Sequence, residues 1–508
     1  MILLWSIGIE TIYGHPTPFY ALYMPVFSSP LTPLAAISCA CIAAIFARMA
    51  ATGAAAVPRG LLAGAATGLL LFLIYYLWGP QVTGVPRATL HAAFLADFQH
   101  HLLFLALAAT ALTALARTVR GKDLLTWTPS PRETAWFLFA TVLVAILLAC
   151  ATAMIRGGLE GISQAYARTT YEYIGDIGKT RSIHDLFRDY IKIHPYLSMH
   201  AKVHPPGPIA VLWIFSYAVG QDPLPLSLAT IVFGALAIIP LYFWIKTLLG
   251  PAAALTACWL YTAVPAVVLF TATSADILFA PFTLATLACF ERAIRRPSTR
   301  FALAAGLGYG VMILLKFSLI GIGAYFAFVG LSLLRKPETR ANVFLTAFLM
   351  AAATATVLLG VYFWSGFNVI AVFHEARNQF HLDQHHLDLV TPRLPAWTYR
   401  FTNPLTWFYF AGIPVSLLFL WQLRWPDKPF RPTLYPILLT LLALNLLYLA
   451  RGEGERSALY LYPFLLVPAT RALFRCIEAS RSLSPLWATL LFLLFQTWFT
   501  ESYFYTYW

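Results

Sequence analysis

The sequence predicts an all-α protein that crosses a membrane many times, and three observations lead to this fold class. First, 60% of the 508 residues are hydrophobic and only 11% are charged, whereas a soluble domain carries roughly 25% charged residues. Second, apolar runs such as 225–244, 343–364 and 433–448 approach the ~20 residues that a helix needs to cross ~30 Å of hydrocarbon. Third, the 15 Trp, 25 Tyr and 38 Phe residues suit the aromatic belts at the two membrane surfaces.

Short basic clusters between the apolar runs indicate how the helices are ordered. A net charge of +13 is shared by many nucleic-acid-binding proteins, but these basic residues gather in loops of the kind that face the cytoplasm. No nucleic-acid partner is therefore expected. About 13–15 spans are predicted, and their approximate positions are 32–49, 60–80, 98–117, 134–155, 225–247, 252–272, 277–291, 302–315, 318–334, 342–365, 404–422, 432–450, 457–472 and 484–502. The short apolar segment 209–220 is either a half-helix or one further span.

The chain divides into two predicted parts. Residues 1–130 form an N-terminal transmembrane segment with about three spans, and residues 131–508 form a larger transmembrane core. If the basic clusters are cytoplasmic, the polar loops 156–208 and 366–402 lie on the extracytoplasmic side. The first of these loops is expected to carry juxtamembrane helices. The polar side chains suited to chemistry fall on this same side, so the sequence predicts one site there.

Two carboxylates in the first loop, Glu172 and Asp176, are candidate catalytic groups. They are four residues apart and share one face if this segment is helical. Two carboxylates on one face suit general-base activation of a hydroxyl or binding of a divalent cation. The alternative is an amphipathic helix that lies on the membrane surface with both carboxylates in solvent.

His200 and His204 have the spacing of a metal-binding pair, but the sequence favours another role. Pro205 follows His204 and biases it away from the helical conformation. No cysteine or nearby carboxylate completes a zinc ligand set. We therefore predict no metal ligands and assign the two histidines to substrate binding through hydrogen bonds. A divalent cation bound by Asp and Glu side chains is retained as an alternative cofactor.

Asp276 and Lys316 are isolated ionisable residues in apolar sequence, which makes them functional candidates because a charge at membrane depth is costly. A lysine that reaches the membrane surface from a helix end is the alternative for Lys316. The segment RGEGER at 451–456 follows a predicted span. Arginine side chains suit phosphate recognition, although the opposite charges of this segment also suit a plain surface loop. Its candidate residues are Arg451, Glu455 and Arg456.

From about residue 134 to the C-terminus, the layout resembles integral-membrane glycosyltransferases of the GT-C superfamily that use polyprenyl-phosphate sugars. This group includes protein O-mannosyltransferases, aminoarabinose transferases and their bacterial relatives. The shared features are the acidic element YEYIGDI followed by the turn HPPGP, and then SAD at 274–276, ILLKFS at 313–318 and GERSALYLYPF at 454–464. Two features depart from the family pattern. The carboxylates of YEYIGDI are not adjacent, and Gly207 stands where leucine is commoner.

The resemblance implies a GT-C-like catalytic core at 131–508, in which Asp176 or Glu172 is the catalytic base. The expected reaction is transfer of a hexosyl or pentosyl sugar from a polyprenyl-phosphate donor to a glycan, lipid or protein acceptor. It is expected on the outer side of a bacterial inner membrane. The substrate-binding residues are expected to be His200, His204, Asp276, Lys316, Arg451, Glu455 and Arg456. The alternative is a transporter or flippase of a lipid-linked or small anionic substrate, which predicts internal repeats and broken helices at mid-depth.

Overall fold

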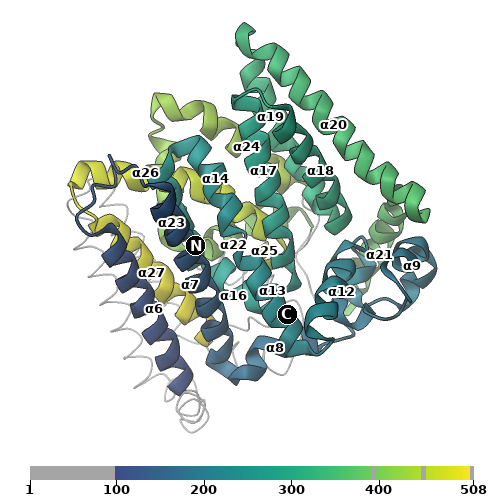
Figure 1. Cartoon of the computed structure of the whole chain (residues 1–508). Helices are drawn as coiled ribbons and strands as arrows, with labels where there is room; N and C mark the ends of the chain where they lie inside the picture. Colours follow the sequence, from purple (N-terminus) through teal and green to yellow (C-terminus); the bar gives the residue numbers. More distant parts are fainter. Residues whose placement is uncertain (1–97, 391–395, 448–453, 504–508) are drawn as a thin grey trace.

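A computed structural model describes residues 98–390, 396–447 and 454–503 as a bundle of helices (Figure 1). These ranges contain no strand, which confirms the predicted all-α class. The expected spans at 32–49 and 60–80 lie outside the described residues. The longer helices are α6 (Phe98–Val119), α7 (Pro131–Gly157), α12 (Gly207–Val219), α13 (Pro223–Ala235), α14 (Ile238–Leu249), α15 (Pro251–Ala263), α16 (Pro265–Thr273), α17 (Phe279–Arg295), α18 (Thr299–Leu315), α19 (Gly323–Leu334), α20 (Pro337–Ser365), α21 (Val369–Val390), α22 (Tyr399–Phe410), α23 (Ile413–Arg424), α24 (Arg431–Leu447), α26 (Tyr462–Ser480) and α27 (Ser484–Tyr503).

Seven helical stretches of the described chain are long and apolar enough to cross a membrane, which confirms a polytopic membrane protein. They are Gln99–Val119, Pro131–Ile155, Pro223–Leu249, Ala275–Arg295, Phe317–Leu334, Pro337–Ser365 and Lys428–Leu447. The number rises to nine if the bent pairs α15–α16 and α22–α23 each form one span.

The expected total of about 13–15 spans is larger than this number. Two of the expected spans fall in residues 1–97, outside the described residues, and others differ from a standard crossing in length or polarity. The expected span at 302–315 is the 17-residue α18, which is short for a crossing, as is the 13-residue α12. The expected span at 484–502 is α27, which carries the buried polar residues Gln496, Thr500 and Glu501.

The start of α7 follows directly from its local sequence. Ser130 accepts a hydrogen bond from the Glu133 backbone N–H through its Oγ atom at 3.2 Å, and Glu133 Oε2 accepts one from the Ser130 backbone N–H at 2.9 Å. Pro131 occupies the first helical turn, where its missing N–H has no cost. This reciprocal cap is a capping box, and it starts α7 at Pro131, three residues before the expected span at 134–155.

Helices α17 and α18 form a hairpin that packs on α20 through glycines. A methyl group at Gly306 would lie 2.4 Å from the Met350 carbonyl oxygen, and one at Gly310 would lie 2.7 Å from Val357 Cβ. Small residues at such contacts let helices in a membrane approach closely. The turn 295–300, which is basic, connects the two helices of the hairpin. At the opposite, open end of the hairpin, the residues just before α17 therefore lie close to those just after α18.

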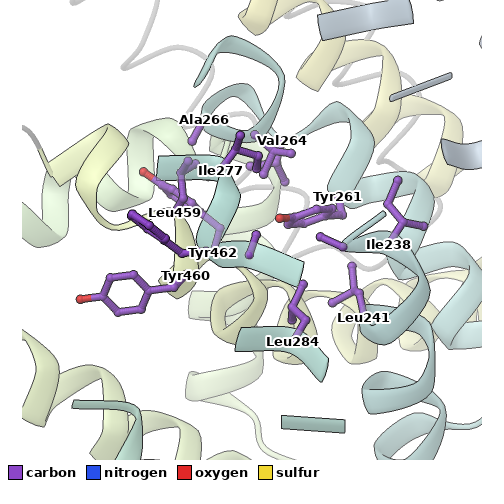
Figure 2. Packing of buried hydrophobic residues seen from close by; sticks show 14 of the residues in the cluster. Ile238, Leu241, Tyr261, Val264, Ala266, Ile277, Leu284, Leu459, Tyr460 and Tyr462 are labelled. Atoms are coloured by element: carbon purple, nitrogen blue, oxygen red, sulfur yellow. The ribbon is translucent and has the colours of Figure 1, made fainter. Parts of the chain in front are cut away.

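The region where α14, α15, α16 and α26 pack contains many buried apolar side chains (Figure 2). Tyr261 of α15 and Ile238 of α14 line the same small cavity in this region. The chain bends by 57° between α15 and α16, next to Pro265. This bend positions the short 3-10 helix η4 (Ala275–Leu278), which carries the SAD sequence.

The polar loop 156–208 folds into the short juxtamembrane helices that the sequence predicts. They are α8 (Leu159–Ala167), η2 (Tyr173–Asp176), α9 (Ile183–Arg188), α10 (Tyr190–Ile193), η3 (His194–Tyr196) and α11 (Met199–Lys202). Most of the second loop, 366–402, is the helix α21, which packs against α10 and α11. Figure 1 shows α9, α12 and α21 gathered at one end of the molecule.

Candidate functional site

Five of the predicted side chains meet at the end of the bundle where the α17–α18 hairpin opens. They come from five separate segments of the chain: the residue before η2, α11, η4, the residue after α18 and the short helix α25 (Gly454–Ser457). Four of the five are less than 10% exposed. The group, which we call the charged cluster, consists of Glu172, His200, Asp276, Lys316 and Arg456.

Asp276 is the anion that joins the two cations of the charged cluster. Lys316 Nζ donates a hydrogen bond to Asp276 Oδ1 at 2.6 Å, and Arg456 Nε lies 3.7 Å from Asp276 Oδ2. Lys316 Nζ also donates to the Ser457 carbonyl oxygen at 3.2 Å. Buried charges are stable only when they are paired in this way. Asp276 therefore holds both cations at one place and limits their net charge.

Glu172 has a different environment, because its carboxylate accepts no hydrogen bond from the described residues. Only 1% of Glu172 is exposed. Its Oε1 atom lies 3.1 Å from His200 Nδ1 and 3.8 Å from Arg456 Nη1, so two basic side chains approach it without completing a hydrogen bond. Buried polar atoms are normally hydrogen-bonded. A carboxylate in this state is suited to accept a hydrogen bond from a bound hydroxyl.

Asp176 is hydrogen-bonded to residues outside the charged cluster. Its oxygens accept from the Ser198 backbone N–H at 2.9 Å, from Ser198 Oγ at 2.6 Å and from Lys179 Nζ at 2.7 Å. Lys179 Nζ also donates to the Tyr196 carbonyl oxygen at 2.6 Å. These bonds tie the first half of the loop to its second half, close to His200. The roles of Ser198 and Lys179 were not predicted, because nothing in their local sequence marks them.

The two carboxylates do not share the helical face that their spacing allows. Glu172 has an extended backbone, with φ −98° and ψ 152°, and η2 begins only at the next residue. Gly175 explains this tight geometry, because a methyl group there would lie 1.9 Å from the Thr169 carbonyl oxygen. The loop backbone therefore closes on itself between Glu172 and Asp176, and the two side chains are directed to different partners.

Gly207 of the HPPGP turn packs directly on the backbone that leads to Lys316. A methyl group at Gly207 would lie 2.2 Å from the Leu314 carbonyl oxygen and 3.1 Å from Leu315 Cα. This close approach requires a residue without a side chain at position 207. The turn thereby supports the end of α18 and the position of the lysine that follows it.

We expect Gly207→Ala to lower thermal stability. The added methyl group must push Leu314 away, and overpacking of this kind costs about 1–3 kcal/mol; the movement also displaces Lys316. The matched control is Gly360→Ala in α20, where a methyl group has no neighbour within 4 Å. The measurement is the unfolding temperature of each purified variant. Equal values for Gly207→Ala and the wild type would contradict the packing argument.

His204 lies beside the charged cluster, and its ring centroid is 6.1 Å from that of Tyr173. The Tyr190 hydroxyl donates to the His204 carbonyl oxygen at 2.8 Å, which fixes the start of the HPPGP turn. Burial, followed by the positive charge of Lys316, lowers the pKa of His204 well below 6.5. The imidazole is therefore neutral in the folded protein at neutral pH.

The low pKa of His204 predicts that the protein loses stability as the pH falls below about 6.5. Unfolding raises this pKa to its ordinary value, so in this range the unfolded chain binds a proton that the folded chain does not. The expected loss is at most about 1.4 kcal/mol per pH unit. The measurement is the unfolding temperature between pH 7.5 and 5.5. His204→Asn should flatten this dependence, whereas His385→Asn, on the exposed surface of α21, should not.

Two predicted substrate-binding residues belong to the segment before α26. Glu455 is 1% exposed, and its carbonyl oxygen accepts a hydrogen bond from the Tyr462 hydroxyl at 2.9 Å. Arg451 lies outside the described residues. Among the described residues, no three His, Cys, Asp or Glu side chains are grouped to hold a metal ion.

Residues 203–364 match the family model of dolichyl-phosphate-mannose-protein mannosyltransferases. The match confirms the resemblance to GT-C membrane glycosyltransferases over a segment that includes HPPGP, Asp276 and Lys316. Glu172, His200 and Arg456 lie outside it. A comparison with curated proteins gives no significant match.

A comparison with solved structures matches an oligosaccharyltransferase from Archaeoglobus fulgidus. The complex with zinc and sulfate is 15% identical with a TM-score of 0.45, over 70% of this chain and 53% of that chain. The apo form is 15% identical with a TM-score of 0.48, over 71% and 56%. The complex of this archaeal enzyme, AglB, with an inhibitory peptide and a dolichol-phosphate is 14% identical with a TM-score of 0.46, over 72% and 56%. The present chain thus spans just over half the length of these structures.

Proposed function

We propose that this chain, which resembles GT-C membrane glycosyltransferases, transfers a sugar from a polyprenyl-phosphate donor to an acceptor hydroxyl on the extracytoplasmic side. The observation that carries this proposal is the pairing, in one buried cluster, of a carboxylate able to accept a proton with two cations able to bind a phosphate. The charged cluster supplies both groups. The sugar is a hexose or a pentose, and the acceptor is a glycan, lipid or protein.

Glu172 is the catalytic base in this proposal. Its carboxylate accepts no hydrogen bond from the described residues, so it has free capacity for an acceptor hydroxyl. The O–H proton moves to Glu172 while the acceptor oxygen forms a bond to the anomeric carbon of the sugar. Asp176 is instead a positioning residue, because Ser198 and Lys179 occupy its carboxylate oxygens. It holds the loop in the shape that brings Glu172 and His200 together.

Lys316 and Arg456 bind the phosphate that leaves. As the bond between the anomeric carbon and the phosphate oxygen breaks, its electron pair stays with the phosphate, which gains negative charge. Cations fixed beside that charge stabilise the transition state more than the ground state. Lys316 is held by two hydrogen bonds, to Asp276 and to the Ser457 carbonyl. It is therefore already in place when the donor binds.

The arrangement of basic residues supports an outward-facing site. Helices η4 and α17 lead from Asp276 to the basic turn at 295–300, and α18 returns from that turn and ends just before Lys316. The charged cluster and the turn thus lie at opposite ends of the hairpin. Basic loops are retained in the cytoplasm, so the other end faces outward. For a bacterial chain this is the outer side of the inner membrane, where the polyprenyl tail lies among the apolar helices.

Purified protein in lipid nanodiscs, supplied with radiolabelled polyprenyl-phosphate sugars and a membrane acceptor fraction, tests the proposal. We expect label in the acceptor and one free polyprenyl phosphate released per sugar transferred. Transport of the donor across a vesicle membrane without release of polyprenyl phosphate would instead support a flippase. If neither release nor transfer occurs with hexose or pentose donors, the proposal is wrong.

A further inference from the structure

Within this proposed function, the contacts of His200 allow its role to be stated more closely. Its two ring nitrogens face chemically opposite neighbours. His200 Nε2 lies 3.4 Å from Arg456 Nη2, and His200 Nδ1 lies 3.1 Å from Glu172 Oε1. Because one ring nitrogen faces a guanidinium and the other faces a carboxylate, these neighbours determine which nitrogen of His200 carries the proton.

The guanidinium determines the tautomer of the histidine. All polar hydrogens of arginine are donors, and it offers no acceptor. In the contact between Arg456 Nη2 and His200 Nε2, the imidazole nitrogen must therefore present its lone pair. A protonated Nε2 would place N–H against N–H and, in the imidazolium form, one cation against another. The proton of the neutral ring is consequently on Nδ1.

We propose that His200 is a positioning residue, held by Arg456 as the neutral Nδ1–H tautomer, that keeps the donor side of its ring beside the carboxylate of Glu172. The contact attracts the carboxylate electrostatically without completing a hydrogen bond, because Glu172 accepts none from the described residues. Both Glu172 oxygens thus keep the capacity to accept the proton of the acceptor hydroxyl. The proposal also links the phosphate site to the base, since one arginine contacts both Asp276 and His200.

The backbone around His200 is built to keep this orientation. The His200 N–H donates to the Tyr171 carbonyl oxygen at 3.0 Å, and the Met199 N–H donates to the Thr170 carbonyl oxygen at 3.1 Å. These two hydrogen bonds join the backbone of residues 199–200 directly to that of residues 170–171, which precede Glu172. The imidazole is only 19% exposed, so little water competes for its nitrogens. Base and histidine therefore move as one unit.

Nuclear magnetic resonance of the full-length protein, with 15N- and 13C-labelled histidine in lipid nanodiscs, tests the tautomer directly. The chain has 12 histidines, and the signals that disappear in His200→Asn identify those of His200. We expect a protonated Nδ1 and an unprotonated Nε2. Arg456→Lys keeps a donor and should retain this form, whereas Arg456→Met should lose it. An Nε2–H tautomer or an imidazolium at His200 in the wild type would overturn the proposal.

A matched pair of variants tests the positioning role through activity. His200→Asn places an amide N–H near the former Nδ1, whereas His200→Gln places its amide near the former Nε2. We expect His200→Asn to stay within about 10-fold of the wild-type kcat and His200→Gln to fall roughly 100-fold, because only the first retains a donor toward the base. Gel filtration of both variants controls for folding.

The two arms of this test separate the role of His200 from the proposed function. Equal activity of the two variants, or the reverse order, would overturn the positioning role. If the wild type transfers no sugar, the proposed function fails, whereas the resonance experiment still decides the tautomer.

Discussion

Glu172→Gln is expected to reduce sugar transfer by roughly 10²–10⁴-fold, the range that general-base catalysis contributes. The amide cannot take the proton of the acceptor hydroxyl, although it has nearly the same shape as the carboxylate. The same change removes a buried charge that accepts no hydrogen bond from the described residues. We therefore expect the variant to unfold at the same temperature as the wild type or at a higher one. The measurements are the transfer rate and the unfolding temperature of the purified variant.

Asp176→Asn is the control for this prediction, and it should behave in the opposite way. Its new amide would place an N–H against a donor of Ser198 or Lys179, so the loop should lose stability. The transfer rate per folded molecule should fall less than in Glu172→Gln. If Asp176→Asn loses transfer while keeping its full unfolding temperature, Asp176 is the base and the assignment of Glu172 is wrong.

Lys316→Ala is expected to lower the transfer rate by roughly 10²–10³-fold, as the loss of one fixed charge-stabilising donor does in other enzymes. The variant removes the cation that Asp276 and the Ser457 carbonyl hold in place. Arg456 then remains as the cation of the charged cluster that contacts Asp276, so the phosphate site becomes less positive. The measurement is the release of labelled polyprenyl phosphate under single-turnover conditions, with donor saturation determined separately.

The control for Lys316→Ala is Lys246→Ala, which removes an exposed lysine from the last turn of α14. It should leave both transfer and donor saturation unchanged. The double variant Lys316→Ala with Asp276→Asn separates charge balance from catalysis. It should regain stability, since no buried anion is left without its lysine, and it should remain inactive. Recovery of transfer in the double variant would show that Lys316 serves only to neutralise Asp276.

Much of the fold could be predicted from the sequence because membrane helices follow local rules. An apolar run of about 20 residues has few other stable conformations in a bilayer. The capping box at Ser130 and the short helices of loop 156–208 likewise depend on nearby residues. The number of spans was less predictable, because helices such as α18 and α27 are shorter or more polar than a standard crossing.

The sequence by itself determined which side chains were candidates for the site, since an ionisable residue in an apolar chain is rare and costly. Only the tertiary structure decided which of them meet. The α17–α18 hairpin brings Asp276 to Lys316, two residues 40 positions apart. The backbone packs closely at Gly175. As a result, the Asp176 carboxylate is hydrogen-bonded to Ser198, whereas the Glu172 carboxylate lies beside His200 and Arg456. These outcomes depend on close approach between distant backbones, which spacing along the chain does not encode.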